Sequence, residues 1–130
     1  MAIEYINVLI NDSGWAWPEA VRQIFRGRCV ELLLVRQADE ALNVLQHRRI
    51  HTAIVDMDCK SGGLAVIKMI RSGFPRLPCI LVANSAEQKL LSVAIELDIF
   101  SVINKPVDIP LLKSQLHRLF FKRYGSSVFA

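Results

Sequence analysis

The chain has 130 residues, of which 52% are hydrophobic, and its formal net charge is +4. This length fits one domain with a real hydrophobic core, and no apolar run is long enough to span a bilayer. The N-terminal segment lacks the basic start and small-residue cleavage site of a signal peptide.

Basic residues are scattered and do not alternate with aromatic residues, which gives little support for nucleic-acid binding. The three cysteines are widely spaced, as expected for reduced thiols in a cytosolic protein.

Short apolar, β-branched runs alternate with helical patterns along the whole chain. In chain order we expect five pairs of a strand and a following helix. The strands are residues 6–10, 29–35, 52–56, 78–83 and 101–104. The helices that follow them are residues 18–26, 38–49, 62–73, 85–98 and 108–125. Several residues mark the helix ends. Pro18 suits a first turn, Gly73 closes the third helix, Ser85 stands at capping-box spacing from Gln88, and Asp108 is the expected cap of the last helix.

Strands this uniformly apolar are typical of a parallel sheet that is covered by helices on both faces. Right-handed crossovers bring the carboxyl ends of all five strands to one edge, where ligands bind in such sheets. We therefore expect one polar pocket to be shared by the residues that follow strands one, three, four and five: Asn11 and Asp12, Asp56 and Asp58, Ala83 and Asn84, and Lys105.

From residue 6 to residue 124 the chain resembles the receiver domain of two-component response regulators, a (βα)5 doubly wound, flavodoxin-like fold. An acidic pair follows the first strand of that family, and here the pair is Asn11-Asp12. The phosphoacceptor aspartate ends the third strand, here Asp56 in AIVDMD. A glycine begins the next helix, here Gly63, and Lys-Pro follows the fifth strand, here Lys105 in NKPVD. The joint order and spacing of these four markers carry the resemblance.

The resemblance implies a phosphoryl-transfer site. Asp56 would accept a phosphoryl group from a histidine kinase or phosphotransfer protein. Mg²⁺ would be held by hard oxygen ligands, namely Asp12, Asp56, the backbone carbonyl of Asp58 and, through a water, Asn11. Lys105 would reach the acceptor and later a phosphate oxygen. The family's lysine–proline bond is usually cis, which aims the lysine side chain.

The sequence departs from the family at positions that matter for signalling. Asn11 replaces a carboxylate, so we expect weakened metal binding. Ala83 replaces the hydroxyl residue that contacts the phosphoryl group, and Val102 replaces the aromatic switch residue. The loop after Asp56 carries Cys59-Lys60 in place of Met-Pro, and Lys60 brings a positive charge close to the pocket.

Two interpretations within the family follow from these departures. In one, Asp56 is phosphorylated and its output is rewired. In the other, which the loss of both the hydroxyl and the aromatic favours, the domain is a pseudo-receiver that signals by partner binding alone. In that case Asp56 and Lys105 would remain as a structural salt bridge.

Two alternatives lie outside the family. Asp56-x-Asp58 matches the motif of haloacid-dehalogenase-type phosphatases, but it stands on the third strand and no downstream acidic pair completes a metal site. A phosphorylation-independent interaction module is the second alternative, in which Trp15 and Trp17 anchor a partner. We expect a receiver rather than an enzyme.

The resemblance also sets expectations for organisation and partners. Residues 1–124 form the domain, and residues 125–130 are a tail or the start of a linker to an output domain, for example one that regulates transcription. The fourth helix, fifth strand and fifth helix form the family's dimerisation surface, so a homodimer is expected. We expect a cytoplasmic location, with no direct contact to nucleic acid or membrane. His47 and His51 flank the entry to the third strand and are interpreted as surface residues.

Overall fold

The computed structural model of the protein describes residues 5–11, 22–26, 28–58, 62–84 and 88–130. Its strands are β1 (Ile6–Asn11), β2 (Val30–Val35), β3 (Thr52–Asp56), β4 (Cys79–Ala83) and β5 (Ser101–Asn104), and its helices are α2 (Ala38–His47), α3 (Gly63–Gly73), α4 (Gln88–Glu96) and α5 (Ile109–Tyr124). Residues 22–25 are also helical. These elements confirm the expected alternation of strand and helix. Pro18 and Ser85 lie outside the described residues.

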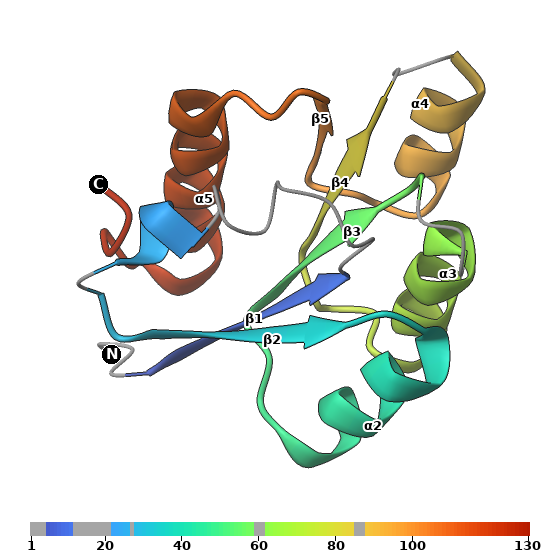
Figure 1. Cartoon of the computed structure of the whole chain (residues 1–130), viewed down its shortest axis with the longest axis horizontal. Helices are drawn as coiled ribbons and strands as arrows, with labels where there is room; N and C mark the ends of the chain where they lie inside the picture. Colours follow the sequence, from blue (N-terminus) through green and yellow to red (C-terminus); the bar gives the residue numbers. More distant parts are fainter. Residues whose placement is uncertain (1–4, 12–21, 27, 59–61, 85–87) are drawn as a thin grey trace.

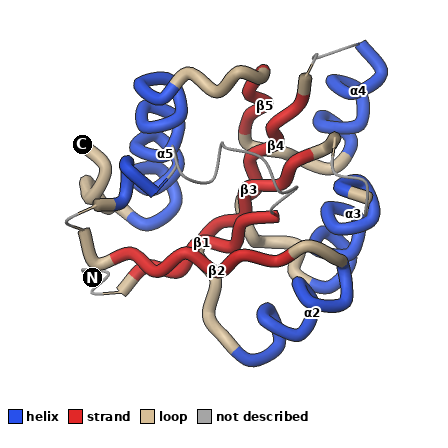
Figure 2. Tube along the Cα trace, in the orientation of Figure 1, coloured by secondary structure: helices blue, strands red, loops and turns tan. Residues whose placement is uncertain are grey.

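All five strands form one parallel sheet in the order β2-β1-β3-β4-β5. Helix α5 and residues 22–25 lie on one side of this sheet, while α2, α3 and α4 lie on the other (Figure 1). Coloured by secondary structure, the strands run through the middle of the molecule between the two sets of helices (Figure 2). The (βα)5 doubly wound, flavodoxin-like architecture is therefore confirmed.

The hydrophobic core has two parts because both faces of the sheet are covered. One cluster joins alternate strand residues such as Ile54 and Ile80 to Leu116 and Phe120 of α5. The other joins the intervening strand residues, such as Val55 and Leu81, to α2 and α3. Every residue of β3 and β4 is buried, whereas the edge strand β2 is largely intermediate or exposed. This difference explains why β3 and β4 consist almost entirely of apolar residues.

Two caps set the ends of α5. The side chain of Asp108 accepts a hydrogen bond of 3.1 Å from the backbone nitrogen of Leu111, which confirms its predicted role as N-cap. At the other end Gly125 is left-handed, with φ of 62°, which is the conformation that glycine adopts most easily at a helix C-terminus.

Residues 125–130 turn back onto the domain after this cap. Phe129 is only 1% exposed and lies between two aromatic rings, with centroid distances of 5.3 Å to Phe25 and 5.0 Å to Phe120. The guanidinium of Arg28 donates a hydrogen bond of 2.8 Å to the carbonyl of Val128. The segment expected as a tail or linker therefore contributes a large side chain to the core.

The expectation that His51 is a surface residue is wrong. It is 3% exposed, and its Nδ1 accepts a hydrogen bond of 3.1 Å from the backbone nitrogen of Asn7. The hydroxyl of Tyr124 donates to the His51 carbonyl at 2.5 Å. The histidine thus joins the starts of β1 and β3 to the end of α5.

Two findings bear on the expectations from composition. Cys29 and Cys79 are free thiols, while Cys59 lies outside the described residues. Among the helices that the structure describes, none is long and apolar enough to cross a membrane.

Candidate functional site

The carboxyl ends of the parallel strands lie at one edge of the sheet, as the sequence predicts. β1 ends at Asn11, β3 at Asp56, β4 at Ala83, and β5 leads directly into Lys105. The strands β1 and β3 are neighbours although β2 lies between them in the chain, so the strand order reverses beside Asp56. Ligands of doubly wound sheets bind at such a reversal.

The centre of this edge is an ion pair between Asp56 and Lys105. The Lys105 Nζ atom donates to Asp56 Oδ1 at 2.7 Å. The side chain of Asp56 is fully buried, while that of Lys105 is 10% exposed. A buried carboxylate needs a compensating charge and hydrogen bonds. The two residues stand 49 positions apart in the chain and meet because β3 and β5 both end here.

Asp58 joins this pair through its side chain. Its Oδ2 atom lies 3.0 Å from Lys105 Nζ and accepts a hydrogen bond of 2.7 Å from the backbone nitrogen of Asn84. The backbone nitrogen of Asp58 donates to Asp56 Oδ1 at 2.9 Å. One ammonium group therefore serves two carboxylates. The receiver resemblance implies only a backbone role for Asp58, because this side-chain contact depends on the path of the turn after β3.

The backbone around Lys105 fixes where its side chain begins. The Lys105–Pro106 peptide bond is cis, as the resemblance implies. The Lys105 nitrogen donates to the carbonyl of Ala83 at 2.8 Å, which continues the pairing of β5 with β4. The lysine side chain accordingly starts next to β4 and ends at Asp56 on β3.

The two residues that depart from the family's switch pattern lie in and beside β4. The Ala83 side chain is 2% exposed and ends in a methyl group, which cannot hydrogen-bond an anion. Val102 is partly buried against the core cluster that contains Leu81. Neither side chain offers the hydroxyl or the aromatic ring that receivers use at these positions.

Gly63 allows the helix after the site to approach it closely. A Cβ atom on this residue would lie 2.3 Å from the carbonyl oxygen of Asp56 and 2.8 Å from the Cα of Met57. Both distances are too short for any side chain. The glycine therefore brings α3 directly against the backbone that carries Asp56.

Several predicted residues lie outside the described part of the chain. These are the predicted metal ligand Asp12, the loop residues Cys59 and Lys60, and the two tryptophans Trp15 and Trp17. Asn11, Asp56, Asp58, Ala83, Asn84 and Lys105 are described and lie at the carboxyl edge of the sheet.

A family model for the response regulator receiver domain matches residues 8–117 of the chain. The chain belongs to this family. The signal receiver domain of an HD domain-containing protein from Pseudomonas fluorescens Pf-5 has a TM-score of 0.82 at 22% identity, with 94% of this chain and 99% of that chain covered. A response regulator receiver domain protein from Methanospirillum hungatei JF-1 has a TM-score of 0.75 at 21% identity, with 94% and 99% covered.

A response regulator from Thermotoga maritima is similar as well, with a TM-score of 0.77 at 18% identity and coverage of 88% of this chain and 97% of that chain. At such identities the likeness shows the fold alone. The comparison with curated proteins gives no match. Receiver domains are generally signalling modules rather than enzymes, and they interact with kinases or phosphotransfer proteins.

Receiver domains typically bind Mg²⁺ in their acidic pocket. The carboxylate and amide oxygens at this edge of the sheet are the type of ligand that Mg²⁺ prefers. Asn11 is 1% exposed, and its Oδ1 is buried without a hydrogen-bond partner among the described residues. Its amide nitrogen faces the carbonyl of Arg36 at 3.5 Å, so the oxygen faces elsewhere. A buried acceptor without a partner suits a metal-bound water. In the described ranges no group of three or more His, Cys, Asp or Glu could hold a metal, and Asp12 lies outside them.

Proposed function

We propose that this receiver domain is an atypical phosphoacceptor module in which Asp56 takes the phosphoryl group and Lys105 assists it. The observation that supports this most directly is the contact of 2.7 Å between Lys105 Nζ and the buried Asp56 carboxylate. The donor would be a histidine kinase or phosphotransfer protein in the cytoplasm, and the output would be a bound partner or a linked domain, such as one that regulates transcription. We expect no direct contact with nucleic acid.

The proposed step is an in-line displacement at phosphorus. An Asp56 carboxylate oxygen forms the new O–P bond while the N–P bond of the donor phosphohistidine breaks, and the imidazole leaves with the electron pair. Lys105 already donates to Asp56 Oδ1, so a small movement would let its ammonium group donate to a phosphoryl oxygen. Since Lys105 also contacts Asp58, that carboxylate would keep the ammonium group in place during the step.

The residues proposed to hold Mg²⁺ are Asp12, Asp56, the carbonyl of Asp58 and, through water, Asn11. When bound, the ion supplies positive charge to the phosphoryl oxygens. Asn11 in place of a carboxylate leaves one negative charge fewer, and we expect weakened rather than abolished binding.

The second candidate is a pseudo-receiver that binds partners without phosphorylation. Ala83 and Val102 favour it because neither side chain can pass a change at Asp56 to the surface of α4 and β5. In this case the Asp56–Lys105 pair holds β3 to β5 and has no chemical role. A phosphatase that uses Asp56-x-Asp58 is less well supported, since the Asp58 carboxylate contacts Lys105 and Asn84 rather than being directed to a leaving group.

Either candidate needs a surface for partners, and we propose a homodimer through α4, β5 and α5. Ile95 of α4 is 82% exposed, and Leu91 of α4 and Leu111 of α5 are about half as exposed, at 42% and 43%. Apolar side chains of this size in contact with water favour association. Residues 1–124 are the proposed domain, with residues 125–130 forming its packed end before any linker.

The test is incubation with Mg²⁺ and acetyl phosphate, followed at once by intact mass spectrometry. We expect the wild-type protein to gain one phosphoryl group and Asp56→Asn to gain none. Asp98→Asn is a matched control, since Asp98 has a positive φ of 53° that asparagine also adopts readily, and it should label like wild type. Sedimentation with and without acetyl phosphate measures the dimer. An unchanged wild-type mass would favour the pseudo-receiver.

A further inference from the structure

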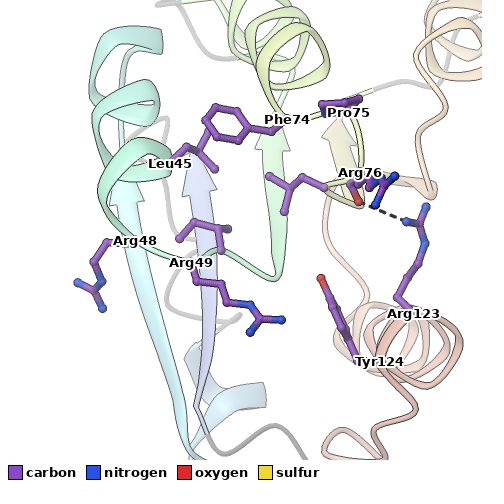
Figure 3. A pocket seen from close by; sticks show the side chains of 10 residues that line it. Leu45, Arg48, Arg49, Phe74, Pro75, Arg76, Arg123 and Tyr124 are labelled. Carbon is purple, nitrogen blue, oxygen red and sulfur yellow. Dashed lines mark hydrogen bonds between the residues drawn. The ribbon is translucent and has the colours of Figure 1, made fainter. Parts of the chain in front are cut away.

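A concave site lies at the amino edge of the sheet, opposite Asp56. It is a cavity of about 690 Å³ formed where α2, α3 and α5 end (Figure 3). The segments between α2 and β3 and between α3 and β4 supply most of its lining, and the last turn of α5 completes it. None of its lining residues belongs to the site at the carboxyl edge.

The lining combines an apolar floor with four arginines. The floor consists of Leu45, Ile50, Phe74, Pro75, Leu77 and Tyr124, and the charged residues are Arg48, Arg49, Arg76 and Arg123. Among the residues that the structure describes, no acidic one lines this cavity. Pockets for small molecules have this volume and this combination of apolar surface with a few polar groups.

Two of the four arginines have protein partners that explain their position. Arg48 pairs with Glu31 at 2.6 Å, and its side chain points away from the other three (Figure 3). Arg123 donates to the carbonyl of Arg76 at 3.3 Å, which joins α5 to the turn before β4.

Arg49 and Arg76 are different. Both are exposed, and their guanidinium groups form no hydrogen bond or ion pair with any residue in the described part of the chain. Burial raises the pKa of Tyr124, while the charges of Arg123 and Arg49 act in the opposite direction, so both groups lie near the tyrosine hydroxyl. Arg49 therefore presents a guanidinium group without a partner among the described residues close to an aromatic side chain.

The helix ends do not account for this much positive charge. Each helix C-terminus carries about half a negative charge, so the ends of α2, α3 and α5 together compensate roughly one and a half positive charges. Glu31 compensates Arg48. The remaining three guanidinium groups therefore leave the cavity clearly positive and able to attract an anion.

We propose that this cavity binds a small amphiphilic polyanion of the nucleoside polyphosphate class. The aromatic body would lie on the apolar floor beside Phe74 and Tyr124, and the phosphate groups would contact Arg49, Arg76 and Arg123. Planar guanidinium groups bind phosphate through paired hydrogen bonds and stack on aromatic rings, which a lysine cannot do equally well. The cavity volume suits a small molecule rather than a folded partner.

The test is calorimetric titration of the full chain with ATP in buffer containing EDTA, so that the acidic edge holds no metal. We expect ATP to bind, and Arg49→Gln with Arg76→Gln to weaken its binding by about tenfold or more, since two charge-assisted contacts are lost. Lys89→Gln removes the same kind of charge from α4 outside the cavity and should leave the affinity unchanged, as should Asp56→Asn.

Inorganic triphosphate and adenosine separate the two halves of the proposed ligand. Each should bind more weakly than ATP, because each contacts only the arginines or only the apolar floor. The arginine variant should melt no lower than wild type without ligand, because like charges are removed. Absence of ATP binding, equal affinity for triphosphate, or unchanged ATP affinity in the double variant would each overturn the proposal.

Discussion

Individual side chains owe their chemistry here to where the backbone places them. Asp56 is fully buried, but the Lys105 ammonium group and the backbone nitrogen of Asp58 both donate to its Oδ1 and compensate the loss of water around the carboxylate. Asn11 keeps an amide oxygen without a partner among the described residues. On an open surface the same residue types would interact mainly with water, and their contacts would contribute little to the free energy of unfolding.

His51 makes stability depend on pH in a defined direction. Burial lowers its pKa, and the charge of Arg49 lowers it further. Its Nδ1 accepts a hydrogen bond from Asn7, which a ring protonated at that atom could not do. The unfolded chain, with a histidine pKa of about 6.5, binds the proton more readily than the folded protein. The free energy of unfolding should therefore fall as the pH drops from about 7 towards 5.

The measurement is urea denaturation at several pH values in wild type and two variants. His51→Asn places an amide oxygen near the position of Nδ1 and should flatten the pH dependence in this range. His47→Asn changes an exposed histidine and should keep the wild-type slope. If His51→Asn and wild type show the same slope, another group is responsible for the pH dependence.

At the level of helices and strands, α3 can contact the end of β3 only because Gly63 has no Cβ atom. Gly63→Ala would place a Cβ atom 2.3 Å from the Asp56 carbonyl. Either α3 or the backbone of Asp56 must move, and we expect the free energy of unfolding to fall by about 2 kcal/mol or more. Phosphorylation of Asp56, if the proposed function holds, should slow in parallel.

Gly73→Ala is the matched control at the other end of the same helix. Nothing lies within 4 Å of the Cβ position there, and alanine favours the helix, so we expect stability to be unchanged or to rise by up to about 1 kcal/mol. Chemical denaturation of both variants measures the difference. Equal stabilities would show that the close approach of α3 to β3 is not required.

For the molecule as a whole, the packed C-terminal segment closes the core on the α5 side of the sheet. Phe129 contacts the rings of Phe25 and Phe120, so the last residues connect α5 with the helical residues 22–25. Phe129→Ala should lower the free energy of unfolding by about 3 kcal/mol or more, because it leaves a cavity in the core.

Phe121→Ala is the control for this substitution, since Phe121 of α5 is 60% exposed and the loss of its side chain should change stability by no more than about 0.5 kcal/mol. Thermal and urea unfolding of the two variants provide the comparison. A small effect of Phe129→Ala would mean that residues 125–130 contribute little to folding and behave as the tail expected from sequence.

Much of the fold could be predicted from the chain itself. The apolar runs of β3 and β4, the cap at Asp108 and the alternation of strand with helix are local patterns, and parallel sheets of this kind bring all carboxyl ends to one edge. That rule was enough to predict that Asp56 and Lys105 lie close together. It could not reveal that Asp58 shares the lysine, because a side-chain contact within a turn depends on the backbone path.

Periodicity and topology thus determined from sequence alone which elements form and which polar residues reach the carboxyl edge. Only the tertiary structure decided the burial of His51, the return of Phe129 to the core and the gathering of Arg49, Arg76 and Arg123 around one cavity. The physical reason is that these residues are far apart in the chain and follow no periodic pattern. Their surroundings are created by three helix ends and a terminal segment, whose packing no local signal encodes.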